Sequence, residues 1–146
     1  MKVLIIIVLL LTGCVSNADF EKECTYTKDS NHIKESVKMN ILYDNKDVTK
    51  DVIYMRSFKA LDDEGYKTIE DIKEASITYN RRYGDKGIKI TVSKDTLDEY
   101  EMKYYIDARN IDSETLKDFN LNKNSIKLFN NLRKKSIECE VKDGNN

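Results

Sequence analysis

The sequence has no Pro, no Trp and a single His among its 146 residues, and these shortages narrow the chemistry it can perform. A zinc site needs clustered His or Cys ligands, and this chain has one His, His32, and three Cys. A Ser-His-Asp triad would have to use His32. No Gly-x-Ser-x-Gly motif and no Gly-rich phosphate loop is present. We therefore predict no catalytic residue, no metal site and no cofactor. We interpret His32 as a solvated residue of a polar turn.

An excess of charge of one sign is also lacking. The chain has 25 Lys and Arg against 26 Asp and Glu, a formal net charge of -1. Nucleic-acid binding usually shows as a basic patch or a high pI, so we expect no nucleic-acid partner. Charged residues make up 35 % of the chain, yet Ile, Val, Leu, Tyr and Phe are numerous enough to form a core. The length suits one folded domain.

The first residues carry the strongest signal. Met1-Lys2 precedes an apolar run, Val3 to Leu11, that is too short to span a bilayer and matches the central region of a signal peptide. Leu11-Thr12-Gly13-Cys14 then resembles the bacterial lipobox. This resemblance implies cleavage after Gly13 and a lipid anchor on Cys14. The alternative is a buried N-terminal strand or helix with an incidental Cys.

These features divide the chain and predict where it resides. The expected parts are a cleaved signal peptide (1–13), a lipidated N-terminus and tether (14–21), one globular domain (22–142) and a frayed tail (143–146). We expect a monomer on the extracytoplasmic face of the cell membrane, held there by its lipid. In a two-membrane host, an Asp after the lipidated Cys would favour retention in the inner membrane. Val15 stands there instead, so the outer membrane is also a location that the sequence allows.

Two cysteines, Cys24 and Cys139, remain once Cys14 carries lipid. An even number outside the cytoplasm suggests a disulfide, and both residues lie in segments that resemble short strands near the two ends of the domain. A bridge would tie these ends together. Two free thiols are an alternative. A redox or metal pair is another, but no Cys-x-x-Cys motif supports it.

Alternating apolar residues predict strands, and a spacing of three to four predicts helices. We expect strands near residues 22–28, 36–43, 48–58, 88–92, 100–106 and 137–141. A long helix is expected to start at Thr68, after a solvated break at Asp62–Gly65, and to end at Gly84 or Gly87. Its apolar stripe would contain Ile69, Ile72, Ala75 or Ser76, Tyr79 and Tyr83.

Two short helices complete the expected set of elements. One opens at Asp112–Glu114, and the other is capped by Asn124 or Ser125. The order of elements predicts an α+β fold. We expect an antiparallel β-sheet of about five to six strands, with one long and two short helices packed on one face.

The order of several short motifs resembles the YehR-like family of small bacterial lipoproteins. The matching segments are Cys24–Thr27, Tyr43–Lys50, Arg82–Gly84 and Cys139–Glu140, within residues 24–140. The resemblance implies an α+β domain at the cell envelope. It carries no catalytic residue to this chain, because none is established for the family.

Tyrosine is the best lead to a binding surface, since the chain has nine. Tyr100 and Tyr104 share one face of a predicted strand and Tyr105 takes the other. Outward tyrosines beside Lys103 and Arg109 would form a candidate binding surface. The alternative is that tyrosine fills a core that has no Trp and few Phe.

We therefore predict a membrane-anchored extracytoplasmic lipoprotein acting as a non-catalytic binding or accessory module. Its partner would be an envelope protein or polymer. One alternative is a small-ligand-binding lipoprotein associated with a transporter. Another is an envelope hydrolase, which a concave pocket with a buried carboxylate of raised pKa would favour.

Overall fold

The structure, a computed structural model, describes residues 19–142. The predicted signal peptide and lipidation site, Cys14, lie outside these residues. The elements are β1 (Asp19–Asp29), β2 (Ile33–Asp44), β3 (Thr49–Ala60), α1 (Asp63–Asp85), β4 (Lys89–Asp95), β5 (Glu99–Asp107), α2 (Ser113–Asp118), α3 (Ser125–Lys134) and β6 (Glu138–Val141).

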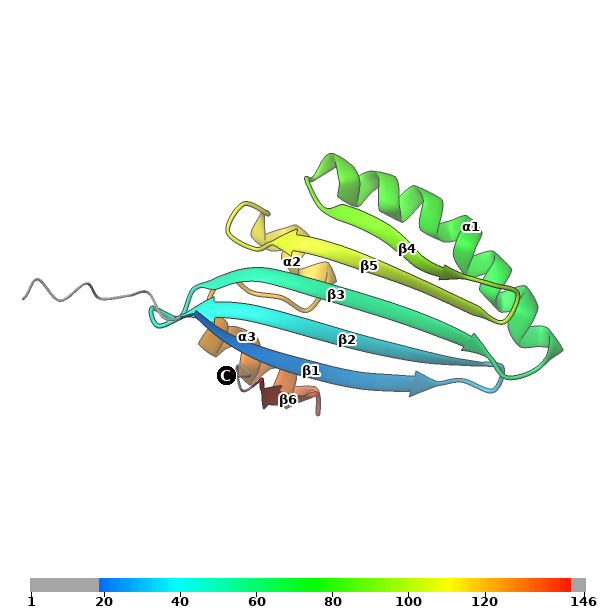
Figure 1. Cartoon of the computed structure of the whole chain (residues 1–146), viewed down its shortest axis with the longest axis horizontal. Coiled ribbons are helices and arrows are strands. Elements are labelled where there is room, and N and C mark those ends of the chain that lie inside the picture. The colour runs from blue at the N-terminus through cyan, green and yellow to red at the C-terminus, as the bar shows by residue number, and fades with distance from the viewer. Residues whose placement is uncertain (1–18, 143–146) are drawn as a thin grey trace, which may run out of the picture.

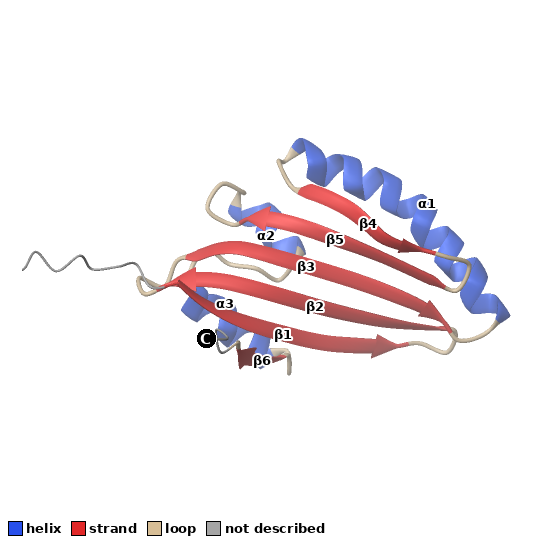
Figure 2. Cartoon of the chain, viewed as in Figure 1, coloured by secondary structure: helices blue, strands red, loops and turns tan. Residues whose placement is uncertain are grey.

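One six-stranded sheet organises the described chain, with the strand order β4-β5-β3-β2-β1-β6. Every neighbouring pair of strands is antiparallel. The long helix α1 and the short helices α2 and α3 lie on the same side of this sheet (Figures 1 and 2). The predicted α+β fold is confirmed.

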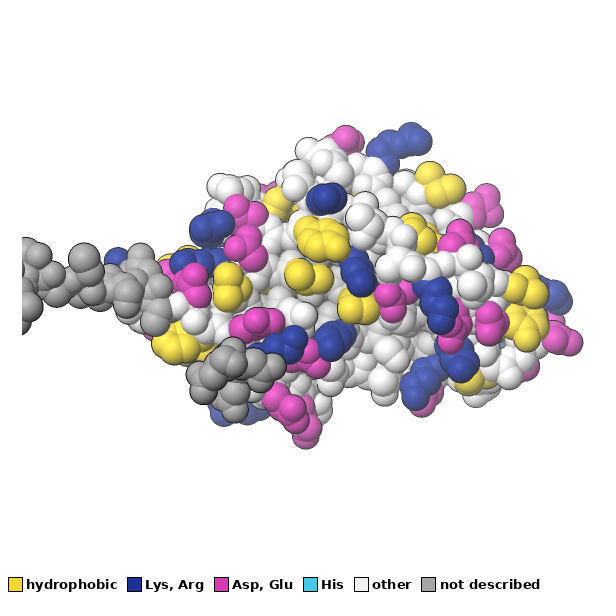
Figure 3. All heavy atoms as spheres, viewed as in Figure 1, with side chains coloured by type: hydrophobic (Ala, Val, Ile, Leu, Met, Phe, Trp, Pro, Cys, Tyr) yellow, Lys and Arg dark blue, Asp and Glu magenta, His cyan; other side chains and the backbone are white. Residues whose placement is uncertain are grey.

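The strands form because apolar side chains alternate with polar ones. In β5, Tyr100, Met102, Tyr104 and Ile106 are buried, whereas Lys103 between them points to the other face. We call the face under the helices the inner face and the opposite one the outer face. The outer face carries a mixture of acidic and basic side chains with separate apolar ones among them (Figure 3).

Helix α1 begins at Asp63, five residues before the predicted start at Thr68. The side chain of Asp62 caps the helix by accepting a hydrogen bond of 2.9 Å from the backbone N–H of Gly65. Gly65 is required here, because a Cβ at this position would lie 2.2 Å from the carbonyl oxygen of His32. The acidic cluster is therefore a capped first turn packed on the start of β2, and its interpretation as a loop was wrong.

The inward stripe of α1 also differs from the prediction. Ile69 and Ser76 are buried, and Ile72 and Tyr83 are partly buried, but Tyr79 is 54 % exposed. The face of α1 that packs on the sheet is therefore centred closer to Ser76 than to Tyr79. At the other end Gly87 has a φ of 90°, a conformation that glycine adopts without strain, and the chain turns there into β4.

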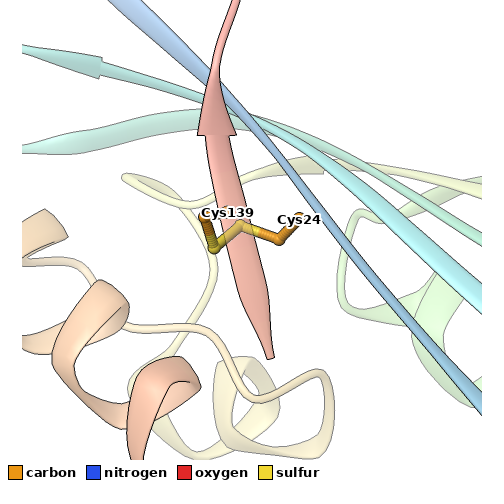
Figure 4. Close-up of a disulfide and its surroundings, with 2 residues drawn as sticks. All are labelled: Cys24 and Cys139. Carbon is orange, nitrogen blue, oxygen red and sulfur yellow. A yellow bond between two sulfur atoms is a disulfide. The ribbon is translucent and has the colours of Figure 1, made fainter. Parts of the chain in front are cut away.

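A disulfide joins Cys24 in β1 to Cys139 in β6 (Figure 4). The two residues are direct partners in the antiparallel register, with their Cα atoms 4.0 Å apart. The structure thus pairs these cysteines as predicted and ties the last strand to the first. No helix within residues 19–142 is long and apolar enough to cross a membrane.

Candidate functional site

The inner face of the sheet changes character along its strands. At one end the register aligns aliphatic side chains, Ile41 with Val52 and Val52 with Ile106. Four residues further along β2 and β3, Val37 lies opposite Arg56. The sheet therefore offers an aliphatic surface at one end and, toward the other, a surface with aromatic and charged side chains.

Helix α1 covers the second of these surfaces with polar side chains. Ser76 Oγ lies 3.0 Å from the hydroxyl of Tyr100, and the Tyr104 hydroxyl donates to Asn80 Oδ1 at 3.2 Å. These residues come from the inward side of α1 and from β5, so hydrogen bonds rather than interlocking apolar groups hold the middle of the helix to the sheet. This leaves room between α1 and the strands.

That room is a groove of about 460 Å³, within the roughly 300–1,000 Å³ typical of small-molecule sites. We call it the aromatic groove. Helix α1 lines one side of the groove, the neighbouring strands β5, β3 and β2 line the other, and the end of α2 contributes to the lining. The side chains that line it are Ile33, Glu35, Tyr54, Arg56, Phe58, Ile72, Ala75, Ser76, Tyr79, Tyr83, Met102, Tyr104, Asp118 and Phe119.

Phe119, which follows α2, is the centre of the aromatic lining. Its ring centroid lies 4.8 Å from that of Tyr83, 5.2 Å from that of Tyr54 and 5.3 Å from that of Tyr104. The rings are tilted or edge-on to one another, the arrangements that aromatic pairs prefer. Three elements and the segment after α2 thus fix one rigid aromatic cluster.

Burial in this cluster keeps the tyrosine hydroxyls protonated. It raises the pKa of Tyr104 to about 12. It also raises the pKa of Tyr54, whose hydroxyl lies 3.4 Å from that of Tyr26. These groups therefore serve as neutral hydrogen-bonding groups at ordinary pH rather than as bases.

One ion pair stands in the wall of the groove. Arg56 Nε donates to Glu35 Oε1 at 2.6 Å, and the guanidinium carbon lies 4.7 Å from the centroid of the Phe58 ring. Burial alone would lower the pKa of Arg56, but the Glu35 carboxylate more than offsets it and the pKa is raised. Among residues 19–142 the two terminal nitrogens of Arg56 have no hydrogen-bond partner. They are free to bind an anionic group.

A second acidic side chain, Asp118, stands beside Phe119 in the groove lining. It accepts a hydrogen bond from the Tyr83 hydroxyl at 3.2 Å and lies 3.5 Å from a terminal nitrogen of Arg82. Burial, followed by the Asp118 carboxylate, raises the pKa of Tyr83. The groove therefore contains three charged side chains: Glu35 on β2, Arg56 on β3 and Asp118 at the end of α2.

The surface predicted from the tyrosines is not assembled as one site. Tyr100 and Tyr104 are buried on the inner face because the alternation of β5 turns them toward the helices. Lys103 and the partly exposed Tyr105 lie on the outer face, where Lys89 approaches the Tyr105 ring to 5.7 Å. Tyr100 and Tyr104 therefore follow the alternative of a tyrosine-filled core, and the five residues form no common surface, although Tyr104 does line the aromatic groove.

Arg109, the last member of the predicted surface, lies just beyond β5. Its Nε is 2.9 Å from an oxygen of Asp107, and this pair raises the pKa of Arg109. His32 is exposed, as predicted, and forms a contact of 2.9 Å with Asp62. In the part of the chain that the structure describes, no three His, Cys, Asp or Glu side chains are placed to hold a metal ion.

Sequence reasoning missed the groove because its lining comes from five separate segments. Arg56 nevertheless had a local signal. It lies two residues from both Tyr54 and Phe58, so the strand alternation places its charge on the inner face. A charged side chain on the inner face of a sheet is unusual in a core, so Arg56 was a signal from which the site could have been found.

The fold is similar to that of one solved protein. A structure described as the "NMR structure of the protein from Streptococcus pneumoniae TIGR4" aligns with a TM-score of 0.50 and 11 % sequence identity, covering 96 % of each chain. At this identity the likeness concerns the fold alone. No protein-family model matches the chain. No curated protein matches it either.

Proposed function

We propose that this protein is a lipid-anchored extracytoplasmic lipoprotein that acts as a non-catalytic binding or accessory module at the cell envelope. The apolar run and the lipobox that ends at Cys14 support the anchor. The aromatic groove supports binding, and it is the observation that carries the proposal. The resemblance to YehR-like lipoproteins agrees with the anchor and carries no binding function to this chain.

The groove suggests what its ligand presents. Rings such as Tyr79, Tyr83 and Phe119 suit a flat or aliphatic apolar portion. The free terminal nitrogens of Arg56 suit a carboxylate, phosphate or sulfonate, because guanidinium groups form strong hydrogen bonds with such anions. We infer an amphipathic ligand with one anionic group, carried by an envelope protein or polymer. The domain acts as a monomer with no nucleic-acid partner and no cofactor.

The volume of the groove also favours a second candidate, a small-ligand-binding lipoprotein associated with a transporter. A complete small molecule would then fill the groove. An envelope hydrolase receives less support. Wherever a carboxyl pKa in residues 19–142 departs clearly from its ordinary value, it is lowered, whereas a general acid for such chemistry needs a raised one.

Titration with anilinonaphthalene sulfonate, a dye with an aromatic body and an anionic group, tests the groove. Arg56→Met should weaken dye binding about 10- to 100-fold, since a charged hydrogen bond is worth roughly 1.5–3 kcal/mol. Glu35→Gln should preserve or strengthen binding, because it frees the guanidinium. Lys103→Met, on the outer face, is the matched control and should leave the affinity unchanged. Equal losses in Arg56→Met and Lys103→Met would contradict the site.

A second pair of variants tests the aromatic wall without disturbing the core. Tyr79 and Tyr105 are both exposed, but Tyr79 lines the groove and Tyr105 lies on the outer face. Tyr79→Ala should weaken dye binding about 2- to 10-fold, as expected for one aromatic contact. Tyr105→Ala should have no effect. The amount of envelope material that co-purifies with the anchored protein should fall with Tyr79→Ala and stay unchanged with Tyr105→Ala.

The anchor is tested separately. Mass spectrometry of the protein from bacterial membranes should show diacylglycerol on Cys14 and no residues before it. Cys14→Ser should leave the full-length chain unprocessed. An unmodified Cys14 in the membrane fraction would contradict the lipoprotein assignment and leave the groove proposal intact.

A further inference from the structure

One end of the sheet lies close to the predicted lipid. Strand β1 begins at Asp19, five residues after Cys14. Five residues span at most about 18 Å, because an extended chain advances roughly 3.3–3.6 Å per residue. Asp19 lies opposite Asp44, the last residue of β2, and so beside the turn between β2 and β3. Figure 1 shows the start of β1 beside the turn that joins β2 to β3.

Exposed apolar side chains gather at this same end. Phe20 is 44 % exposed, Val48 37 % and Ile126 54 %. Phe20 stacks on Tyr43, with ring centroids 5.6 Å apart. Val48 forms a β-bridge with Asn124, directly before α3 and two residues before Ile126. We call Phe20, Val48 and Ile126 the anchor-end patch.

Backbone hydrogen bonds hold the turn between β2 and β3 against the start of α3. The N–H of Ser125 donates to the carbonyl of Asp47 at 2.9 Å, and that of Thr49 donates to the carbonyl of Lys123 at 2.8 Å. The patch therefore comprises residues of β1, of α3 and of a turn that these backbone hydrogen bonds hold in place.

The charges around the patch favour an anionic surface. Lys46, Lys123 and Lys127 are exposed and form no ion pair within the described chain. Nearby carboxylates are already engaged: Asp19 pairs with Lys50 at 2.6 Å, and Asp107 pairs with Arg109. Two carboxylates at the turn oppose the three lysines: Asp47, and Asp44, whose Oδ1 accepts hydrogen bonds from the backbone N–H groups of Lys46 and Val48.

We propose that the anchor-end patch inserts into the interface of the lipid bilayer, with Lys46, Lys123 and Lys127 contacting anionic headgroups. The proposal rests on the lipid anchor at Cys14, whose short tether brings this end to the membrane surface. Exposed aromatic and aliphatic side chains beside lysines suit the boundary between headgroups and acyl chains. The sheet then stands on the membrane by this end, and the aromatic groove faces the envelope rather than the lipid.

The opposite end of the sheet serves as an internal control. Leu97, between β4 and β5, is 66 % exposed and therefore even more accessible than the patch. It lies next to the end of β3, since the Ala60 N–H donates to the carbonyl of Asp98. A strand as long as β2, with 12 residues, spans roughly 36 Å, which is about twice the reach of the tether.

Single tryptophans can report the depth of each end, because the chain has no Trp of its own. The variants are Val48→Trp, Ile126→Trp and, as the matched control, Leu97→Trp. Residues 14–146 include every described element, and with the disulfide formed Cys14 is the free thiol. This thiol is coupled to a maleimide lipid in vesicles of phosphatidylcholine and phosphatidylglycerol with brominated acyl chains.

We expect the bromines to quench Val48→Trp and Ile126→Trp at least twofold and to leave Leu97→Trp unchanged. Equal quenching of all three variants, or none in the first two, would overturn the proposal. Replacing Lys46, Lys123 and Lys127 by Gln should reduce the quenching in anionic vesicles to its level in pure phosphatidylcholine. An unchanged signal would remove the lysines from the proposal.

The chemical coupling separates this proposal from the anchor itself. If mass spectrometry finds no lipid on Cys14 in bacterial membranes, the proposed anchor fails. The quenching then still decides whether the patch contacts a bilayer that is brought within reach of residue 14. If the lipid is present and the patch is not quenched, the anchor stands and the docking surface fails.

Discussion

The two halves of the inner face are covered in different ways. Leu116 of α2 and Leu128 and Leu132 of α3 are fully buried, so aliphatic side chains fill the space beneath these helices. Under α1 the middle of the helix meets the sheet through Ser76 and Asn80, and a groove remains. The same sheet thus has one half that is filled and one that is left open. We expect stability to depend on the first half and ligand binding on the second.

Loss of the disulfide should have the largest effect on the filled half. Replacing Cys24 and Cys139 by Ser removes the bond that closes a loop between two residues 115 positions apart. The chain-entropy model then gives a loss of up to about 4–5 kcal/mol in the free energy of unfolding, and measured values are often smaller. Urea denaturation of the oxidised and variant proteins measures the loss. Equal midpoints would show that β6 is held without the bridge.

Shortening one buried side chain of α3 should have the next largest effect on the free energy of unfolding. Leu132→Ala removes a fully buried side chain and should cost about 2–5 kcal/mol, through lost burial and the cavity left behind. Ile77→Ala, at an exposed position of α1, is the matched control and should change the free energy of unfolding by less than about 0.5 kcal/mol. If Leu132→Ala lowered the free energy of unfolding as little as Ile77→Ala does, stability would not depend on the filled half.

A change under α1 should be milder. Ser76→Ala deletes the hydroxyl that donates to the Lys73 carbonyl at 2.7 Å and lies 3.0 Å from that of Tyr100. The expected loss is about 1–3 kcal/mol, because the Tyr100 hydroxyl loses a buried partner. Thermal unfolding of Ser76→Ala and Leu132→Ala shows which half of the inner face contributes more to stability. A larger loss for Ser76→Ala would reverse the comparison.

The smallest effect concerns acid stability at the start of α2. The backbone N–H of Thr115, and then its hydroxyl, donate to Asp112 and lower the pKa of this carboxyl from 3.8 to about 2. A lowered pKa in the folded state stabilises the protein above pH 4 and ceases to do so as the pH falls from 4 to 2. Asp112→Asn should therefore be less stable than the unchanged protein at pH 6 and equal to it near pH 2. Unfolding midpoints across this range measure the difference, and a gap that persists at pH 2 would contradict it.

Local patterns predicted the elements better than their assembly. Strict alternation was enough for β5, and the cysteine count was enough for the bridge between Cys24 and Cys139, whereas the pairing of β1 with β6 was not predicted. The start of α1 was misjudged because Asp, Glu and Gly favour turns as well as helix starts, and only the contact of Gly65 with the His32 carbonyl separates the two. The groove depends on registers such as Val37 with Arg56, which composition does not determine.

The place of β1 between β2 and β6 has a mechanical consequence. With the lipid anchor proposed at Cys14, β1 is the first described strand that a pull on the lipid would reach. The load then acts along the strand, across an eleven-residue pairing with β2 on one side and a disulfide to β6 on the other. Hydrogen bonds loaded in this direction share the force instead of opening one after another. The strand nearest the proposed anchor is thus fastened on both sides, by its ladder with β2 and by a covalent bond to β6.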